Sequence, residues 1–62
     1  MDIEQIMAAI RSLAESQGYY GRLYNELREM QTNDPEKWEE VKNMLEAQHF
    51  NDSLDMVMYF EY

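Results

Sequence analysis

Apolar residues recur at helical spacing along the first quarter of the chain. They fall three and four positions apart between Asp2 and Gln17, so they share one side of a helix, while the opposite side is polar or carries alanine. We predict a helix over residues 2–17, which Gly18 stops or bends because glycine accepts the left-handed conformation at a helix end. The apolar positions are Ile3, Ile6, Met7, Ile10, Leu13 and Ala14.

A second helical pattern covers residues 19–32. Gly21 lies in its first turn, where the unfavourable helix propensity of glycine, about 1 kcal/mol relative to alanine, is softened by the helix end. The missing side chain suggests a close approach by the first helix or by a partner. The apolar sector consists of Tyr20, Leu23, Tyr24, Leu27 and Met30, and the polar sector of Arg22, Asn25, Glu26 and Glu29.

The clearest boundary in the chain is the dipeptide Asp34-Pro35. Asp34 is a good N-cap, because its carboxylate accepts hydrogen bonds from free amides, and Pro35 suits the first helical position, where its missing N–H removes no hydrogen bond. We predict a third helix over residues 35–49. Its expected inner face consists of Trp38, Val41, Leu45 and Gln48 or His49.

The last segment, residues 53–60, is apolar on nearly every side. Asp52 is its expected N-cap. Asp55 follows three positions later, the place that Glu or Gln takes in a capping box. We predict a short helix, with a strand as the alternative because its valine and aromatic residues also suit a sheet. A segment apolar all round is expected to be buried, either in its own core or across an interface.

These patterns predict one all-α domain over residues 1–62, a small bundle of three main helices and a short C-terminal helix. A chain of 62 residues buries only about 60% of the surface that its unfolded form exposes, so its stability is marginal without help. It has no cysteine, which excludes disulfides and thiolate zinc sites and fits a reducing compartment. Small scaffolds without cross-links rely on helix packing or association. Eight aromatic residues and six methionines are a large apolar supply for such a chain, so part of them is expected to be covered by a second copy or by a partner. Of these two we expect the second copy, a homo-oligomer.

Two features bear on localisation. The N-terminal segment lacks the basic start and continuous apolar run of a signal peptide. No run of about 18 apolar residues, the length of a membrane-spanning helix, occurs in the chain. We expect the protein to be cytoplasmic and without contact to a membrane.

The net charge of −8 is unevenly distributed. Residues 1–32 carry five acids and three arginines, whereas residues 33–62 carry eight acids and two lysines. The third helix gathers acids on one outer face without a lysine in that sector, and such a field repels nucleic acids and attracts basic proteins. A solvated helix face is the ordinary alternative. The face consists of Glu36, Glu39, Glu40, Asn43 and Glu46.

Tyrosines and an arginine gather at the start of the second helix. Tyrosine and arginine are the residue types of protein-binding hot spots, because they offer large contact areas with directional polar groups. Tyr20 and Tyr24 are expected in the core, which leaves Tyr19 and Arg22 for an exposed role or for the rim of the core. The candidate protein-binding residues are Tyr19, Arg22, Glu36, Glu39, Glu40 and Glu46.

A helix-turn-helix is the weaker alternative at the same place. Ala14 and Gly18 have the spacing of its turn, but Gln17 stands where that motif takes an apolar residue, and the would-be recognition helix carries Glu26 and Glu29. Contacts to phosphates normally dominate affinity for DNA, and a protein with a net charge of −8 repels phosphates. We therefore expect no direct binding of nucleic acid.

Residues for catalysis or metal binding are sparse. Glu46 and His49 have Glu-x-x-His spacing, as in di-iron bundles, but Glu46 is expected on the outer face and His49 beside the core. The serines have no histidine at a readable spacing, and a chain of this size has no room for a large pocket. We expect no enzymatic activity, no metal and no cofactor.

Two segments resemble short acidic proteins encoded among phage and mobile-element genes of gut Firmicutes. The resemblance implies a phage-like genetic context, in which small acidic inhibitors of nucleic-acid machinery are common, and it implies no site residues. The segments are Ser16-Gln17-Gly18-Tyr19-Tyr20-Gly21-Arg22-Leu23 and Asp55-x-Val57-Met58.

The function predicted from the sequence is that of a small acidic protein-binding module without enzymatic activity. The first alternative is an anti-defence inhibitor or DNA mimic, which uses the acidic face of the third helix to occupy a basic nucleic-acid-binding groove. The second alternative is a helix-turn-helix-like DNA-binding regulator.

Overall fold

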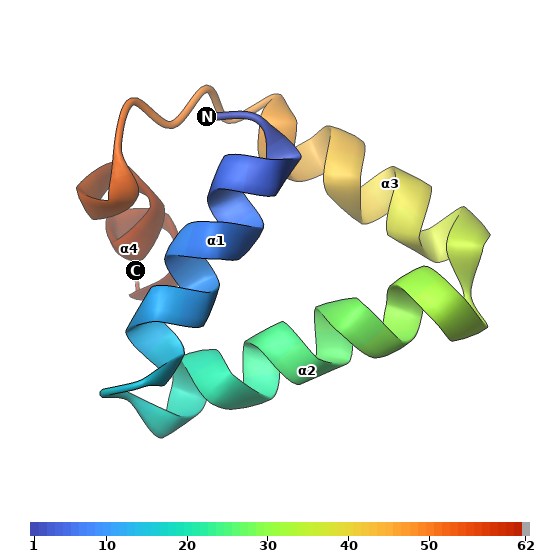
Figure 1. Cartoon of the computed structure of the whole chain (residues 1–62). Coiled ribbons are helices and arrows are strands. Elements are labelled where there is room, and N and C mark those ends of the chain that lie inside the picture. Colours follow the sequence, from blue (N-terminus) through green and yellow to red (C-terminus); the bar gives the residue numbers. More distant parts are fainter. Residues whose placement is uncertain (62) are drawn as a thin grey trace.

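A computed structural model describes residues 1–61, which form four helices and no strand (Figure 1). The all-α fold with three main helices and a short C-terminal helix is confirmed, and for the last segment the helix is right and the strand is wrong. The helices are α1 (Ile3–Ala14), α2 (Gly18–Asn33), α3 (Pro35–Glu46) and α4 (Ser53–Glu61).

Three helix starts are fixed by aspartate side chains. Asp34 accepts a hydrogen bond from the Lys37 amide at 3.3 Å, with Pro35 in the first helical position, as the sequence predicts. Asp52 likewise accepts from the amide of Asp55 at 3.0 Å. At α1 the structure adds a capping box that the sequence analysis did not identify. Asp2 and Gln5 exchange backbone-to-side-chain hydrogen bonds of 2.9 Å, which satisfies two free amides at once.

The corner between α1 and α2 differs from the prediction. Helix α1 ends at Ala14, three residues earlier than predicted, and Gln17 is the extended N-cap of α2. Gly18 is the first residue of α2 and has no positive φ, so it does not end α1 in a left-handed conformation. The predicted close approach at Gly21 is wrong, because a Cβ placed there would meet only the Ala14 methyl of α1, at 4.0 Å, which is ordinary van der Waals contact.

Helix α3 ends at Glu46, so the predicted helical residues 47–49 lie outside it. The left-handed residue here is His49, with a φ of 55°. His49 and Gln48 are both exposed, and neither belongs to the inner face of α3. The turn redirects the chain toward α1, where Phe50 enters the core and its carbonyl accepts a hydrogen bond from the N-terminal amino group.

The core takes residues from every helix. Helices α1 and α2 pack most extensively, α3 closes against both, and α4 packs against α1 (Figure 1). The predicted apolar sides of α1 and α2 face inward, and the predicted polar sides are exposed. Trp38 of α3 is half-buried against this cluster. The buried residues are Ile6, Ile10, Tyr20, Leu27, Leu45, Phe50 and Met56.

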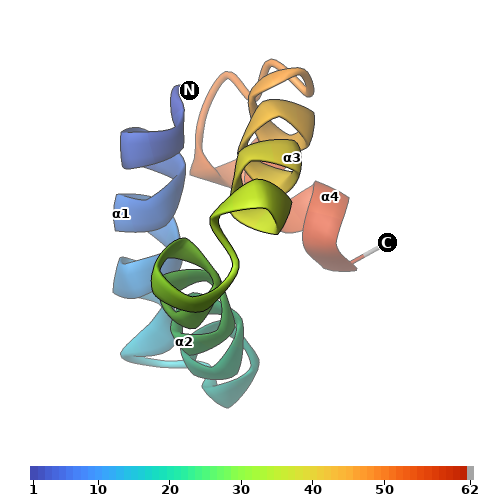
Figure 2. The same ribbon diagram turned by 90° about the vertical axis from the view of Figure 1, so that its right-hand side faces the viewer.

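Helix α4 is only partly buried, at one edge of the molecule (Figure 2). Met56 is fully buried, but Leu54 and Met58, one helical turn apart, are 65% and 53% exposed. The prediction that this helix is buried within its own chain is therefore wrong for its outer side. Burial across an interface stays a prediction.

Candidate protein-binding surface

The first part of the surface is at the start of α2, where Tyr19 and Arg22 are both exposed. The rings of Tyr19 and Tyr20 pack edge to face, with their centroids 5.2 Å apart and their planes at 86°. Tyr20 is fully buried, so this contact holds the exposed ring of Tyr19 in place. Leu23 and Glu26 join Tyr19 and Arg22 around an open hollow.

The sequence analysis did not assign Glu26 or Glu29 to any binding surface, yet both are exposed and line a second hollow. Glu26 is common to the first and second hollows. The signal was present in the sequence, because positions 19, 22, 26 and 29 are three or four residues apart and share a helix face. The second hollow extends from α2 to α3 and is lined by Glu26, Glu29, Met30, Asn33, Asp34 and Lys37.

Lys37 also lines a third hollow, which lies along α3. We name these three hollows, each of which shares one residue with the next, the α2–α3 furrow. The first is lined by α2 alone and the third by α3 alone, and only the second has residues of both helices. The furrow joins Tyr19 and Arg22 to Glu40 of the predicted acidic face, whereas Glu36 and Glu39 do not line it. The third hollow is lined by Lys37, Glu40, Val41, Asn43 and Met44.

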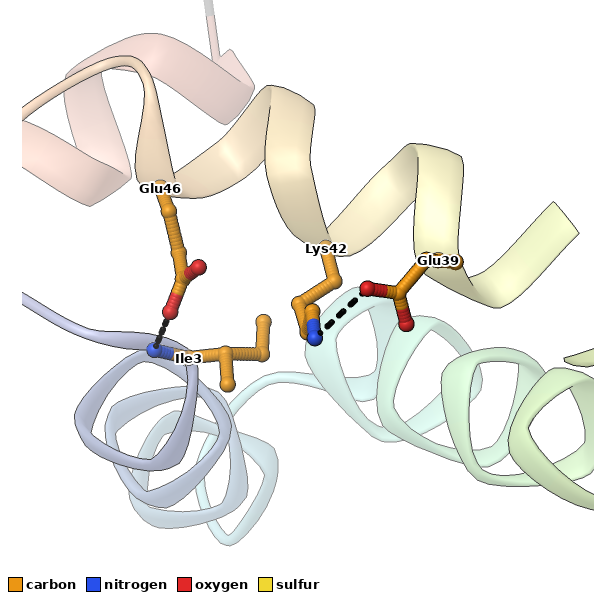
Figure 3. Close-up of polar contacts among 4 residues, drawn as sticks. All are labelled: Ile3, Glu39, Lys42 and Glu46. Atoms are coloured by element: carbon orange, nitrogen blue, oxygen red, sulfur yellow. Dashed lines mark hydrogen bonds and ion pairs between the residues drawn. The ribbon is translucent and has the colours of Figure 1, made fainter. Parts of the chain in front are cut away.

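The acidic face of α3 is smaller than predicted. Glu36, Glu39 and Glu40 are exposed, but the Glu39 carboxylate forms an ion pair of 2.9 Å with Lys42 (Figure 3). The hydrogen bond to Glu39 and the negative charge of Glu39 raise the pKa of Lys42 above its ordinary value. Lys42 lies outside the predicted acidic sector but reaches into it, which leaves Glu36 and Glu40 without a cationic partner among residues 1–61.

Glu46 does not belong to the outer acidic face. Its side chain is half-buried and accepts a hydrogen bond of 2.9 Å from the backbone amide of Ile3 (Figure 3). A carboxylate at this place satisfies a free N–H in the first turn of α1 and faces the positive end of its dipole. The structure therefore gives Glu46 a structural role, and the prediction that it lies on an exposed binding face is wrong.

Tyr20 carries the one buried side-chain oxygen or nitrogen that has no hydrogen-bond partner in residues 1–61, its hydroxyl. Burial raises the pKa of the Tyr20 phenol, and the negative charge of the nearby Glu61 carboxylate raises it further. A buried hydroxyl without a partner is unfavourable.

Two further hollows lie between α1 and α2, and Met7 and Tyr24 line both of them. Their charged residues balance, because one holds Arg11 and Glu15 and the other Glu4 and Arg28. The α2–α3 furrow instead holds four acids and two bases. Of these hollows in the described residues, those of the furrow favour a charged partner of one sign.

Within residues 1–61 no three acidic or histidine side chains converge as metal ligands. The Glu46–His49 pair in particular is divided, since Glu46 turns to α1 and His49 is exposed. In the same range no helix has both the length and the apolar character that crossing a membrane requires. Comparison of the chain with protein-family models, curated proteins and solved structures gives no match.

Proposed function

We propose that the protein is a small acidic protein-binding module that acts in the cytoplasm without catalysing a reaction. One observation carries this proposal: Glu26 and Lys37 link Tyr19 and Arg22 to the acidic side of α3 in one furrow. These shared residues support a binding surface that is built from both helices. The overall charge of −8 favours a basic partner.

Capture experiments with matched surface variants test this function. Wild-type protein immobilised on beads is expected to retain a defined set of basic proteins from a bacterial lysate. The double variants Y19A/R22A and E26Q/E29Q are expected to lose these proteins, because all four residues line the furrow. The control E4Q/E15Q removes the same number of acids from α1 and is expected to retain them.

Two results would contradict the proposed function. One is that wild-type protein retains no protein above the level of the beads alone. The other is that both furrow variants retain every partner, since the furrow then contributes nothing to binding.

The alternative of an anti-defence inhibitor or DNA mimic is supported by the exposure of Glu36, Glu39 and Glu40 on α3. The ion pair between Glu39 and Lys42 weakens this alternative, because it neutralises one of the three carboxylates. A mimic competes with duplex DNA for a basic protein, and charge reversal of the three glutamates is expected to abolish the competition. Binding of duplex DNA by the protein itself at physiological salt would contradict mimicry and favour a DNA-binding regulator.

A further inference from the structure

Helices α1 and α2 form another side of the molecule, which shares no lining residue with the furrow. Its two hollows each have residues of both helices, and Met7 and Tyr24 belong to both hollows. We name this side the α1–α2 face. Arg11 and Glu15 line one of its hollows, and Glu4 and Arg28 line the other.

The four charged side chains of the α1–α2 face can all meet a partner. Each of them is exposed, and none forms an ion pair with another side chain of residues 1–61. Two acids and two bases cancel, so the face is neutral in a chain whose net charge is −8. The face therefore suits a partner surface that itself carries both signs of charge.

A second copy of the chain offers such a surface. The net charge of −8 opposes the approach of two copies, so they meet most easily through a face whose own charges cancel. The exposed apolar side of α4 is less suitable, because α4 carries Asp55 and Glu61 and no base. Like charges brought together across an interface are unfavourable. Charge thus favours the α1–α2 face for self-association.

The order of residues along α1 sets the register of two copies. Glu4, Ala8 and Arg11 are exposed and lie four and seven positions apart, so they form one stripe along the helix. Glu4 and Arg11 are equally far from the midpoint between Met7 and Ala8. Two antiparallel α1 helices that cross at this midpoint place each Glu4 opposite the Arg11 of the other copy. The small side chain of Ala8 lets the helices approach to the usual distance of about 8–10 Å.

We propose that two copies of the chain associate through the α1–α2 face, with their α1 helices antiparallel about Met7 and Ala8. The dimer has two identical ion pairs, each between Glu4 of one copy and Arg11 of the other, as two-fold symmetry requires. Half-buried Met7 contributes apolar contact at the centre. The inference is independent of the proposed function, because the furrow consists of other residues.

Exchange of the two charges tests this pairing by sedimentation equilibrium. In R11E each Glu4 meets a second acid, and in E4R each Arg11 meets a second base. Either variant alone is therefore expected to raise the dissociation constant of the dimer about tenfold or more. An equimolar mixture of the two variants is expected to associate about as tightly as wild type, because both pairs in a mixed dimer join opposite charges. E4R/R11E is expected to dimerise by itself for the same reason.

Matched controls change the same charges elsewhere. E40R and R22E alter exposed residues of the furrow by the same two units of charge. Each is expected to leave the dissociation constant unchanged, and their mixture is expected to gain nothing. Circular dichroism checks that α1 stays folded in each variant. If a reversed charge unfolds α1, E4Q/R11Q removes both ion pairs without adding repulsion and is expected to raise the dissociation constant about fivefold.

Three results would overturn the inference. The first is a wild-type protein that stays monomeric at micromolar concentration. The second is a wild-type dimer whose dissociation constant is unchanged in R11E, E4R and E4Q/R11Q, which would place the interface elsewhere, and on α4 if L54S/M58S is then monomeric. The third is a mixture of R11E and E4R that associates no better than either variant alone. The proposed function is decided separately, by the capture of basic proteins from lysate.

Discussion

Glu46 connects the end of α3 to the start of α1, 43 positions away in the chain, because its carboxylate accepts a hydrogen bond of 2.9 Å from the Ile3 amide. Replacement by alanine removes the acceptor and leaves a half-buried N–H in the first turn of α1 without a partner. Replacement by glutamine keeps an acceptor oxygen but removes the charge that faces the α1 dipole. The two variants therefore separate the hydrogen bond from the charge.

The expected magnitude follows from the type of contact. A hydrogen bond to a charged group contributes about 1.5–3 kcal/mol, and a neutral one about 0.5–1.5 kcal/mol. We expect E46A to lower the free energy of unfolding by about 2 kcal/mol and E46Q by about 1 kcal/mol. At about 0.05–0.15 kcal/mol per residue, the whole chain has roughly 3–9 kcal/mol of stability. The loss in E46A is therefore a large fraction of the total.

Urea unfolding followed by circular dichroism measures these differences. Thermal unfolding gives a second reading, in which 1 kcal/mol lowers Tm by about 4–8 °C for a domain of this size. E40A is the matched control, because Glu40 is exposed in the middle of the same helix and surface changes usually stay within about 0.5 kcal/mol. If E46A unfolds at the same urea concentration as E40A, the carboxylate does not stabilise α1.

Three further predictions concern other parts of the fold. Y20F removes a buried hydroxyl without a partner, and we expect it to stabilise the protein by about 1 kcal/mol in urea unfolding at pH 7. The folded-state pKa of Tyr20 is raised. The contribution of its neutral phenol to the free energy of unfolding is therefore complete below the unfolded pKa of about 10 and is lost as pH rises above it. A loss of stability between pH 9 and 11 that is equally steep in Y20F would contradict this assignment. G21A places a methyl group in ordinary contact with α1, so we expect a Tm increase that corresponds to about 1 kcal/mol, and a decrease would show that α1 approaches too closely for a side chain. If Leu54 and Met58 form an interface between two copies, sedimentation is expected to give an oligomer for wild type and a monomer for L54S/M58S; a stable wild-type monomer at micromolar concentration would refute self-association.

Much of the fold follows from local patterns. Helices α1 and α2 have their apolar and polar sides where the helical period places them, because a sustained stripe of apolar residues is stable only against a core. The starts of α3 and α4 were also predictable, since Asp34-Pro35 and Asp52 act through amides within the next three residues. The capping box of Asp2 and Gln5 has an equally local signal.

The candidate surface was predictable only in part. Exposure of Tyr19, Arg22 and Glu40 follows from the face that each occupies on its own helix. Glu26 and Glu29 share the face of Tyr19, but their connection to α3 depends on how the two helices meet at Asp34. Helix periodicity describes one helix at a time and carries no information on that angle.

The sequence by itself determined the helices, most of their caps, the inner faces of α1 and α2, and the excess of negative charge. These properties depend on residues within one or two helical turns of each other. Tertiary structure alone decided that Glu46 turns inward to Ile3, that His49 takes the left-handed turn, and that α4 keeps an exposed apolar side. It also aligned α2 with α3 to form the furrow. The Glu46 contact joins residues 43 positions apart, and the other outcomes depend on how whole helices pack, which the period of a single helix does not describe.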